Sequence, residues 1–249
     1  MIEIESLVKV YDGVPAVDGL SLRVPPGEIL GLVGPNGAGK TTTLRCLSGI
    51  LPPTSGRIAI GGFDLQAQPV DARRRLAFVP DEPRLFENLT VFDHLRVVGR
   101  LYGIPDAVAR GGELLSRFEL ADRRDAFPSE LSRGMKQKLM IATALLHNPS
   151  VLVLDEPLTG LDPGAMRRVK RTIVEQAQNG TAVLVSSHLL HLVQEICSRV
   201  AILRAGRKVV EGTLPEIRAA MPDLKEGADL EEIFLRATEG EEADEDGAA

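Results

Sequence analysis

A glycine-rich segment that ends in a lysine and a threonine constrains this chain more than any other part of its sequence. The run Gly34-Pro35-Asn36-Gly37-Ala38-Gly39-Lys40-Thr41 matches the pattern G-x-x-x-x-G-K-[ST]. It follows the apolar stretch Ile29–Val33 and precedes leucines at helical spacing, Leu44 and Leu47. A strand, a loop and a helix in this order predict a site for a chain of phosphates.

The residue types of this run are those that phosphate binding requires. Glycines let backbone N–H groups turn toward the phosphates, and the start of the following helix adds partial positive charge. Lys40 can reach the β- and γ-phosphates, and the Thr41 hydroxyl can ligate Mg²⁺. The alternative is a glycine-rich turn with a solvated lysine. We predict nucleotide binding by Gly34, Pro35, Asn36, Gly37, Ala38, Gly39, Lys40, Thr41 and Thr42.

A second apolar run, Val151–Leu154, ends in two acids, Asp155 and Glu156. Ligands of open α/β sheets bind at the carboxyl ends of the strands, so a buried strand here would bring both acids to the phosphate loop. We predict that Asp155 holds Mg²⁺ and that Glu156 is the general base that polarises the attacking water. Taken alone, the pair would indicate a solvated strand end. The phosphate loop upstream favours the catalytic interpretation.

Short apolar runs bounded by glycine and proline predict an α/β fold. Three of them are nearly continuous Val, Leu, Ile and Ala, which is typical of parallel strands covered by helices on both faces. Helical patterns follow each of these three runs. The predicted strands are Leu20–Val24, Ile29–Val33, Arg57–Ile60, Leu76–Val79, Val151–Leu154, Ala182–Ser186 and Val200–Leu203.

The strand pattern disappears between Phe86 and Asn148, and helical patterns replace it. A predicted capping box at Thr90 and Asp93 opens this region. Apolar residues at helical spacing form two stripes: Val91, Leu95, Val98 and Tyr102, then Met135, Leu139, Ala142 and Leu146. The pair Gly111-Gly112 should weaken a further helical stretch by about 1 kcal/mol per glycine. We predict one domain over residues 1–237 with a helical insertion at roughly 86–147.

Composition limits where such a protein works. No apolar run approaches the roughly 18 residues needed to cross a bilayer, and the acidic start Met1–Glu5 does not look like a signal peptide. We therefore expect a cytoplasmic protein whose role at a membrane comes through a partner. Cys46 and Cys197 lack the spacing of a metal or redox motif, so we expect neither a disulfide nor a zinc site.

The net charge of −6 comes from the end of the chain. Six acids without a basic residue among them account for it: Glu239, Glu241, Glu242, Asp244, Glu245 and Asp246. Residues 1–238 are then neutral and carry no basic excess for a phosphate backbone, so no nucleic-acid partner is expected. We predict that residues 238–249 form a disordered, solubilising tail.

The segment Leu131–Gln137, which reads LSRGMKQ, resembles the signature motif of the ATP-binding cassette (ABC) ATPases, usually LSGGQ. The other family elements occur in family order: an aromatic at Tyr11, the phosphate loop, the signature, the acidic strand, Gly160-Leu161-Asp162 and His188. The resemblance covers the chain up to about residue 237. It implies an α/β, P-loop NTPase core with a mixed sheet flanked by helices, an antiparallel β subdomain at its edge and an inserted α-helical subdomain.

The resemblance also implies that ATP is sandwiched between two subunits. In that family the signature contacts the γ-phosphate held by the opposite subunit, so Ser132 and Gly134 are expected to close over the ATP of a second copy. Asp162 is expected to make a further contact across the dimer. From the residues alone, Ser132 and Asp162 are N-caps of the helices that follow, and both roles can hold together.

Tyr11 and His188 acquire roles from the same resemblance. Tyr11 is expected to stack on adenine, although a single tyrosine near a strand end is more often a packing residue. His188 follows a predicted strand and could hydrogen-bond the γ-phosphate and orient Glu156; a surface histidine is the alternative. The predicted catalytic residues are thus Lys40, Glu156 and His188.

Two departures from the family pattern fall in the predicted site. The family usually has Gln after the strand Leu76–Val79, where this chain has Asp81, a further candidate ligand of Mg²⁺. In the signature, Arg133 replaces Gly and adds a cation near phosphate, while Met135 replaces Gln and is expected in the core. These variants are similar to the branch of type-2 exporters of the Ecs and daunorubicin-resistance kinds, which implies export.

The resemblance finally implies two protein partners. One is an integral membrane permease, which would hold the chain at the inner face of the cell membrane; the other is a second ATPase, either a copy or a close relative. The expected docking surface is Leu85–Val98, where Phe86, Leu89 and Phe92 could form an apolar patch. Core packing of these side chains is the alternative.

Two other functions compete with transport. A soluble ABC ATPase acting on ribosomes or nucleic acid usually has two cassettes in one chain, a long coiled coil or basic extensions, and this sequence shows none of them. A scaffold that has lost catalysis is disfavoured because Lys40, Asp155, Glu156 and His188 are all present.

Overall fold

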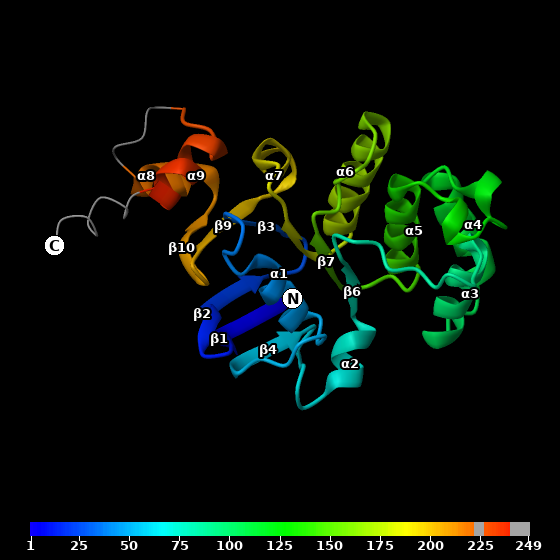
Figure 1. Ribbon diagram of the computed structural model, residues 1–249, viewed down its shortest axis with the longest axis horizontal. Helices are drawn as coiled ribbons and strands as arrows, with labels where there is room; N and C mark the ends of the chain where they lie inside the picture. Colours follow the sequence, from blue (N-terminus) through cyan, green and yellow to red (C-terminus); the bar gives the residue numbers. More distant parts are fainter. Residues whose placement is uncertain (222–226, 240–249) are drawn as a thin grey trace.

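The computed structural model describes residues 1–221 and 227–239. Figure 1 shows a central sheet with a small antiparallel sheet against one part of it and a group of helices at the far end of the molecule. The predicted acidic tail lies almost wholly outside the described residues.

The central sheet has six strands in the order β10-β9-β3-β8-β7-β6. Strands β9, β3, β8, β7 and β6 run parallel, and β10 pairs antiparallel with β9. The sheet is therefore mixed. Its strands are β3 (Ile29–Val33), β6 (Leu76–Val79), β7 (Val151–Asp155), β8 (Ala182–Ser186), β9 (Arg199–Arg204) and β10 (Arg207–Gly212).

A second, four-stranded sheet has the order β2-β1-β4-β5, with every pairing antiparallel. Its strands are β1 (Ile2–Tyr11), β2 (Val14–Val24), β4 (Ser55–Ile60) and β5 (Phe63–Asp64). Helix α1 (Lys40–Leu47) shares one buried cluster with both sheets, through Leu44 and Leu47 of the helix, Ile2 of β1 and Leu30 of β3. The helix that follows the phosphate loop is therefore fixed from two sides.

The region 86–147 forms helices and short 3₁₀ turns and contains no strand. Thr90 caps its first helix, because its Oγ1 accepts a hydrogen bond from the backbone N–H of Asp93 at 3.1 Å. Leu95, Leu115 and Leu139 join one core cluster with strands β6 and β7. The helices of this region are α3 (Val91–Leu101), α4 (Ala107–Arg117) and α5 (Arg133–Leu145).

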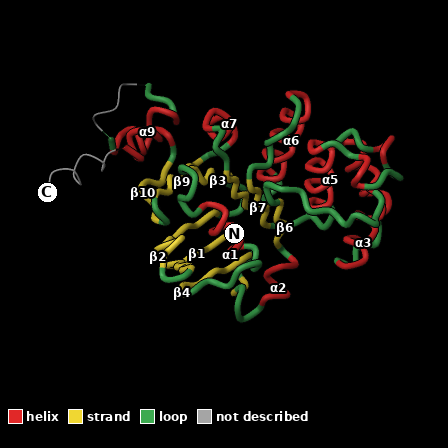
Figure 2. The backbone as a smooth tube through the Cα atoms, viewed as in Figure 1, coloured by secondary structure: helices red, strands yellow, loops and turns green. Residues whose placement is uncertain are grey.

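The remaining helices flank the central sheet, as Figure 2 shows in red. They are α2 (Pro69–Arg74), α6 (Pro163–Gln178), α7 (Leu190–Ile196), α8 (Leu214–Ala220) and α9 (Leu230–Glu239). Helices α8 and α9 pack on β9 and β10 through Ile217, Leu230 and Ile233. Within the described residues, no helix combines the length and the hydropathy that a membrane span requires.

The predicted fold class is confirmed, and the predicted strand bounds differ at the edges of the sheets. Strands β5 and β10 carry no apolar run, so nothing in their residues indicated a strand. Strand β2 begins at Val14 rather than Leu20, because its first half is partly solvent-exposed and mixes polar with apolar residues. Strands β3, β6 and β8 have the predicted bounds, since each is a short apolar run that is largely or wholly buried, although β6 lies at the end of the sheet.

Candidate active site

The glycine-rich loop connects the end of β3 to the start of α1 and is packed tightly against its surroundings. A Cβ at Gly34 would lie 2.5 Å from the carbonyl oxygen of Leu203 in β9. Gly39, the residue before α1, has φ of 96° and lies so close to Ala16 that a Cβ would collide with the Ala16 carbonyl oxygen. Glycine is therefore required at both positions, and the loop backbone is held in one shape.

Lys40 folds back over this loop. Its Nζ donates hydrogen bonds to the carbonyl oxygens of Gly34 at 2.6 Å and Pro35 at 3.0 Å. Burial lowers the pKa of Lys40, while the carboxylates of Glu156 and Asp155 oppose that shift. The ammonium group is thus positioned over the space that the loop encloses, where a phosphate oxygen can replace a loop carbonyl as its acceptor.

Asp155 is the last residue of β7, and its neighbour in the sheet is Ser186, the last residue of β8. The carboxylate of Asp155 is 2% exposed and accepts a hydrogen bond from the Ser186 hydroxyl. A buried polar group is costly unless it is hydrogen-bonded, and the Ser186 hydroxyl supplies that bond. The parallel sheet therefore delivers and orients this acid at the edge where the phosphate loop lies.

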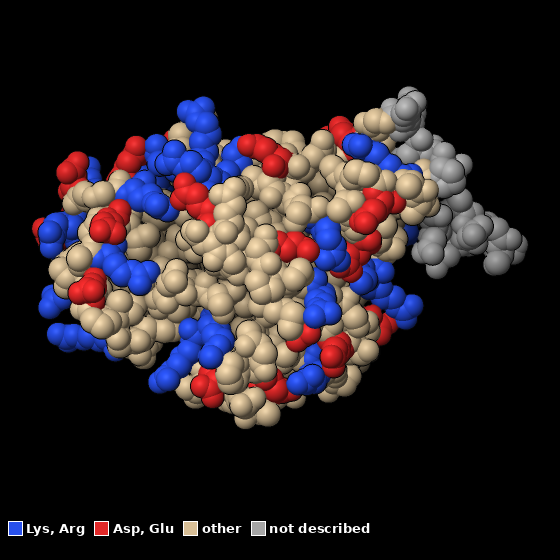
Figure 3. Space-filling view, turned by 180° about the vertical axis from the view of Figure 1, so that it is seen from behind, with Lys and Arg blue, Asp and Glu red and all other residues tan. Residues whose placement is uncertain are grey.

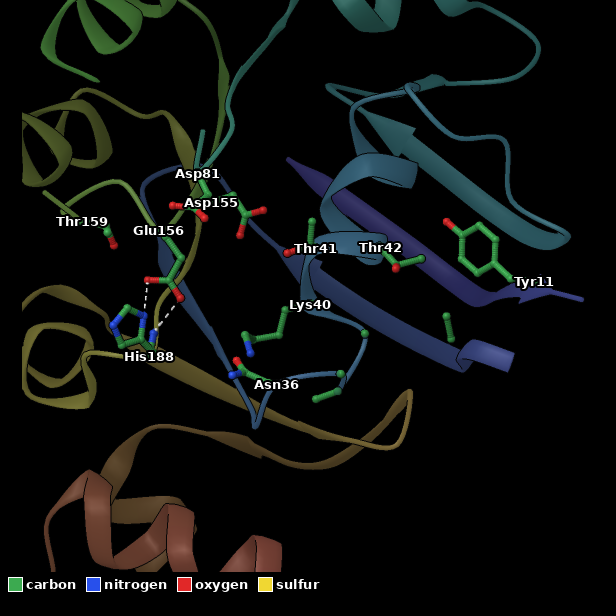
Figure 4. A pocket seen from close by; sticks show the side chains of 14 residues that line it. Tyr11, Asn36, Lys40, Thr41, Thr42, Asp81, Asp155, Glu156, Thr159 and His188 are labelled. Atoms are coloured by element: carbon green, nitrogen blue, oxygen red, sulfur yellow. Dashed lines mark hydrogen bonds and ion pairs between the residues drawn. The ribbon is translucent and has the colours of Figure 1, made fainter. Parts of the chain in front are cut away.

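Glu156 is held by three donors from the next loop. Its Oε1 accepts from the backbone N–H of His188 at 2.9 Å, and its Oε2 accepts from Ser187 Oγ at 3.2 Å. Nδ1 of His188 lies 2.8 Å from Oε2 as well (Figure 4). The backbone of Glu156 is left-handed, with φ of 48°, which is uncommon for this residue type. Strain of this kind is frequent at functional sites.

A cavity of about 550 Å³ joins these groups, which is within the usual size range of small-molecule sites. It is lined by Tyr11, Ala16, Asn36, Gly37, Ala38, Gly39, Lys40, Thr41, Thr42, Asp81, Asp155, Glu156, Thr159 and His188. Figure 4 shows Tyr11 at the opposite end of the cavity from Glu156 and His188. The Tyr11 ring is half-exposed and therefore available for stacking, with Lys9 Nζ 5.1 Å from its centroid.

Gly34 and Pro35 are not among the residues that line this cavity. Instead, both contribute through their carbonyl oxygens, which hold Lys40. Asp81 does line the cavity, and its carboxylate is also paired with Arg133 at 3.5 Å.

Three other predicted binding residues, Ser132, Gly134 and Asp162, do not line the cavity of their own chain. Ser132 caps α5 by accepting a hydrogen bond from the N–H of Met135 at 3.2 Å. Asp162 caps α6 in the same way, accepting from Ala165 N–H at 2.9 Å. These three residues lie at helix starts outside the cavity, so a single chain presents the two parts of the predicted ATP site separately.

The local contacts explain the residue types in this second part. A Cβ at Gly134 would lie 2.9 Å from the Gly160 carbonyl oxygen, so a larger residue would displace the loop before α6. Backbone N–H groups of Ala165 and Gly164 lower the pKa of the Asp162 carboxyl. Met135 is half-buried and packs against the main core cluster, as its place in the sequence predicted.

The donors in the cavity suit a Mg²⁺ ion that is shared with phosphate. Thr41 and Asp155 offer a hydroxyl and a carboxylate, the oxygen donors that Mg²⁺ prefers. Among the described residues no group of three or more His, Cys, Asp or Glu side chains could hold a metal ion alone. An ion here would complete its shell with phosphate oxygens and water. Cys46 and Cys197 are free thiols.

Sequence reasoning missed three hydroxyl residues of the site, Thr159, Ser186 and Ser187. Ser186 donates to Asp155, the predicted Mg²⁺ ligand, and Ser187 donates to Glu156, the predicted general base, while Thr159 lines the cavity. The signal was available, because two serines, the last residue of a buried strand and the one after it, directly precede His188. Hydroxyls at the carboxyl end of a parallel strand next to two acids are candidates for orienting them.

Comparison with known proteins places these features in a family. A family model described as "ABC transporter" matches residues 17–159. The Nod factor export ATP-binding protein I of Paraburkholderia xenovorans is 40% identical over 235 residues, which cover 94% of this chain and 76% of that protein. The daunorubicin/doxorubicin resistance ATP-binding protein of Streptomyces peucetius is 39% identical over 222 residues, covering 88% and 67%.

Solved structures agree with this result. A chain described as the ATP-binding subunit of an ABC transporter superimposes with a TM-score of 0.91 at 36% sequence identity. The match covers 95% of this chain and 99% of that one.

Proposed function

Because this chain belongs to the ABC transporter family as an ATP-hydrolysing subunit, we propose that two ATPase subunits enclose each ATP between them. The phosphate loop of one subunit and the signature segment of the other, defined here as Ser132–Gly134, form the two sides of each site. Hydrolysis in these sites powers a separate membrane permease. Cassettes of this family form dimers.

The main support for a dimer is that the cavity of a single chain lacks part of the predicted ATP site. It contains the phosphate loop, Asp155, Glu156 and His188, yet it lacks Ser132, Gly134 and Asp162. The signature segment begins α5 with its N-cap side chain exposed, so it is free to face a ligand of another molecule. A helix start of this kind favours the negative charge of phosphate. A second subunit, either a copy or a close relative, supplies the signature segment that the cavity lacks.

The residues within the cavity divide the chemistry among them. The loop N–H groups and Lys40 bind the phosphate chain, and Tyr11 stacks on the adenine ring. Glu156 accepts a proton from the attacking water, and His188 holds the Glu156 carboxylate and contacts the γ-phosphate. Thr41 and Asp155 hold Mg²⁺, which neutralises charge that develops on the phosphates. Asp81 remains a candidate for a further contact with that ion.

The permease docks on the surface that begins at the loop before α3. Phe86 is 66% exposed, Leu89 is half-buried, and Phe92 packs against the core cluster. Phe86 is therefore the main open contact of the three. The loop is held by the buried His94, whose Nε2 accepts a hydrogen bond from Phe86 N–H at 3.0 Å. Through this contact, movement of the permease would reach helix α3.

The proposed docking surface can be tested with the complex of subunit and permease. Phe86→Asp should leave ATP binding by the isolated subunit within about 2-fold of the parent, because the side chain is exposed. It should also prevent co-purification with the permease. Leu101→Asp is the matched control, since Leu101 is 77% exposed at the other end of α3. Retention of Phe86→Asp on the permease would move the docking surface elsewhere.

Export is the direction that the relatives favour. The two curated relatives described above are named for Nod factor export and for daunorubicin/doxorubicin resistance. We propose that this subunit powers outward transport of an organic molecule, which the permease recognises. The chain works at the cytoplasmic face of the membrane, held there by that permease.

A role on ribosomes or nucleic acid has less support. The relatives are named as ATP-binding proteins of Nod factor export and of drug resistance, and residues 1–238 carry no net charge. On the face shown in Figure 3, acidic and basic side chains are interspersed. Binding to a phosphate backbone would need a concentrated basic surface.

Glu156→Gln tests the catalytic assignment. The amide keeps the size of the side chain but cannot accept the proton, so kcat should fall by about 10²–10⁴-fold. Binding of a fluorescent ATP analogue should stay within about 2-fold of the parent, because the phosphate loop is unchanged. Turnover at the parental rate would remove Glu156 as the base.

A further inference from the structure

Two residues that depart from the family pattern, Asp81 and Arg133, form an ion pair with each other. Nη2 of Arg133 lies 3.5 Å from Oδ1 of Asp81. One residue follows β6, and the other is the first residue of α5. The pair thus connects the loop beside the ATP cavity to the signature segment of the same chain.

Asp81 lies between two cavities. It lines the ATP cavity, and Figure 4 shows it beside Asp155. It also lines a neighbouring cavity of about 470 Å³ together with Glu82, Pro83, Arg133 and Lys136. The Asp81 carboxylate can therefore respond to what occupies the ATP cavity.

Arg133 stands between Ser132 and Gly134, the two residues expected to reach the partner's phosphate. Its stem lies along the loop before α6: a Cβ at Gly160 would be 3.3 Å from Arg133 Cδ and 3.4 Å from Nε. The side chain is nevertheless 58% exposed. The stem is supported while the guanidinium group remains free to change partner.

The ion pair is loose. Both side chains are at least half-exposed, and the 3.5 Å contact is a single one rather than the paired contacts of a bidentate geometry. Exposed pairs of this kind add little to folding stability. A phosphate group carries more charge and matches the guanidinium fork, so it is a stronger partner.

The charges of the cavity favour an exchange of partners. Three carboxylates, Asp81, Asp155 and Glu156, line it together with a single lysine, Lys40. Asp81 adds negative charge beside the site of a triphosphate, which is unfavourable unless a cation offsets it. Arg133 offsets Asp81 in the single chain, and the phosphate of a neighbouring subunit would compete for the same cation.

We propose that Arg133 is a further phosphate-binding residue of the ATP sandwich and that Asp81 is its counter-ion in the separated subunit. As the dimer closes, the guanidinium group exchanges the carboxylate of its own chain for the γ-phosphate held by the partner. Asp81 is then a positioning residue, which acts by holding Arg133. The inference rests on the proposed function, since only a second subunit can bring Arg133 opposite a bound triphosphate.

This proposal predicts opposite effects for the two members of one ion pair. In the Glu156→Gln background, the ATP concentration for half-maximal dimerisation is measured by analytical ultracentrifugation. Arg133→Gln should raise it by about 5–10-fold, because a charged contact to phosphate is lost. Asp81→Asn should lower it by about 2–5-fold, because Arg133 no longer has to leave a carboxylate. An ion pair that only supports the fold would shift both variants in the same direction.

A double variant distinguishes an effect of Asp81 that acts through Arg133 from direct repulsion between Asp81 and the bound triphosphate. If Asp81 acts through Arg133, Asp81→Asn should change the midpoint by less than about 1.5-fold once Arg133→Gln is present. Arg117→Gln is the matched control, because Arg117 pairs with Glu175 at 3.0 Å, also links the helical insertion to the core and is similarly exposed. That control should leave the midpoint unchanged.

Three outcomes overturn the proposal. Shifts of both single variants in the same direction show a structural pair, and an equal effect of Asp81→Asn with and without Arg133 shows direct repulsion. An Arg133→Gln midpoint equal to that of the parent removes Arg133 from the site. In each of these cases the Glu156→Gln parent still dimerises, so the proposed function survives. Failure of that parent to dimerise with ATP overturns the ATP sandwich and this inference together.

Discussion

Single hydroxyl groups position the two carboxylates of the site. Ser186 is fully buried and donates to Asp155, whereas its neighbour Ser187 donates to Glu156. Because adjacent residues serve different acids, the proposed metal-binding role of Asp155 and the proposed proton-accepting role of Glu156 can be tested separately by mutation. Lys40 is also positioned by a few hydrogen bonds, since the loop carbonyl oxygens hold its ammonium group where phosphate would bind.

The two serines should give different kinetic defects. Ser186→Ala leaves Asp155 without a buried donor, so ATPase activity should need about 3–10-fold more Mg²⁺ for half-saturation. Ser187→Ala should lower kcat by about 2–10-fold with the Mg²⁺ dependence unchanged, because the general base is less well held. Titration of Mg²⁺ against ATPase rate measures both. The same Mg²⁺ shift in both variants would show a general loosening of the loop instead.

The cysteines should be chemically silent in the folded protein. The sulphur of Cys197 packs against Gly31, and burial raises the pKa of the Cys197 thiol to about 12. Burial raises the pKa of the Cys46 thiol as well. A raised pKa lowers the thiolate fraction, so iodoacetamide at about pH 8 should label neither residue until denaturant is added. Mass spectrometry of the native protein measures the extent of labelling at each cysteine. Rapid labelling of Cys197 would contradict the packing.

At the scale of elements, glycines set how closely helices approach. Gly99 of α3 faces α4 so closely that a Cβ there would overlap the Cβ of Ala107. A Cβ at Gly112 of α4, in contrast, would have no neighbouring atom within 4 Å. One glycine is therefore needed for the packing of the helical insertion, and the other only lowers helix propensity.

Alanine at these two positions should have opposite effects on stability. Gly99→Ala should reduce the free energy of unfolding by about 1–3 kcal/mol, because α3 and α4 must move apart. Gly112→Ala should increase it by about 0.5–1 kcal/mol through helix propensity. Urea denaturation, monitored by circular dichroism, gives the free energy of unfolding of each variant for comparison with the parent. Equal destabilisation by both variants would mean that a side chain at Gly112 of α4 disturbs the packing as much as one at Gly99 of α3.

The elements also show how far the sequence could be interpreted. The central strands and the phosphate loop were predictable, because a buried parallel strand is a continuous apolar run and the loop pattern is specific. Edge strand β10 was not, since one side of it faces solvent and its sequence is mixed. The Asp81–Arg133 pair could not be found from the sequence either, because the two residues are distant in the chain and only the fold brings them together.

At the scale of the whole molecule, the chain presents two half-sites on separate elements. The cavity collects residues from the phosphate loop, β1, β7 and the loops after β6 and β8, whereas the starts of α5 and α6 lie outside it. In the proposed ATP sandwich, a subunit alone would bind ATP on one side only. Coupling between ATP and transport would then require that two subunits meet and separate.

Mixing two defective subunits tests this central claim most directly. A tagged Lys40→Ala subunit cannot bind phosphate, and an untagged Ser132→Arg subunit cannot close over it, so neither should self-associate with ATP in the Glu156→Gln background. A mixed dimer contains one site with an intact loop from one chain and an intact signature from the other. The account predicts ATP-dependent capture of the untagged subunit by the tagged one. If ATP leads to no capture in the mixture, while the Glu156→Gln parent captures itself, the signature does not act across the dimer.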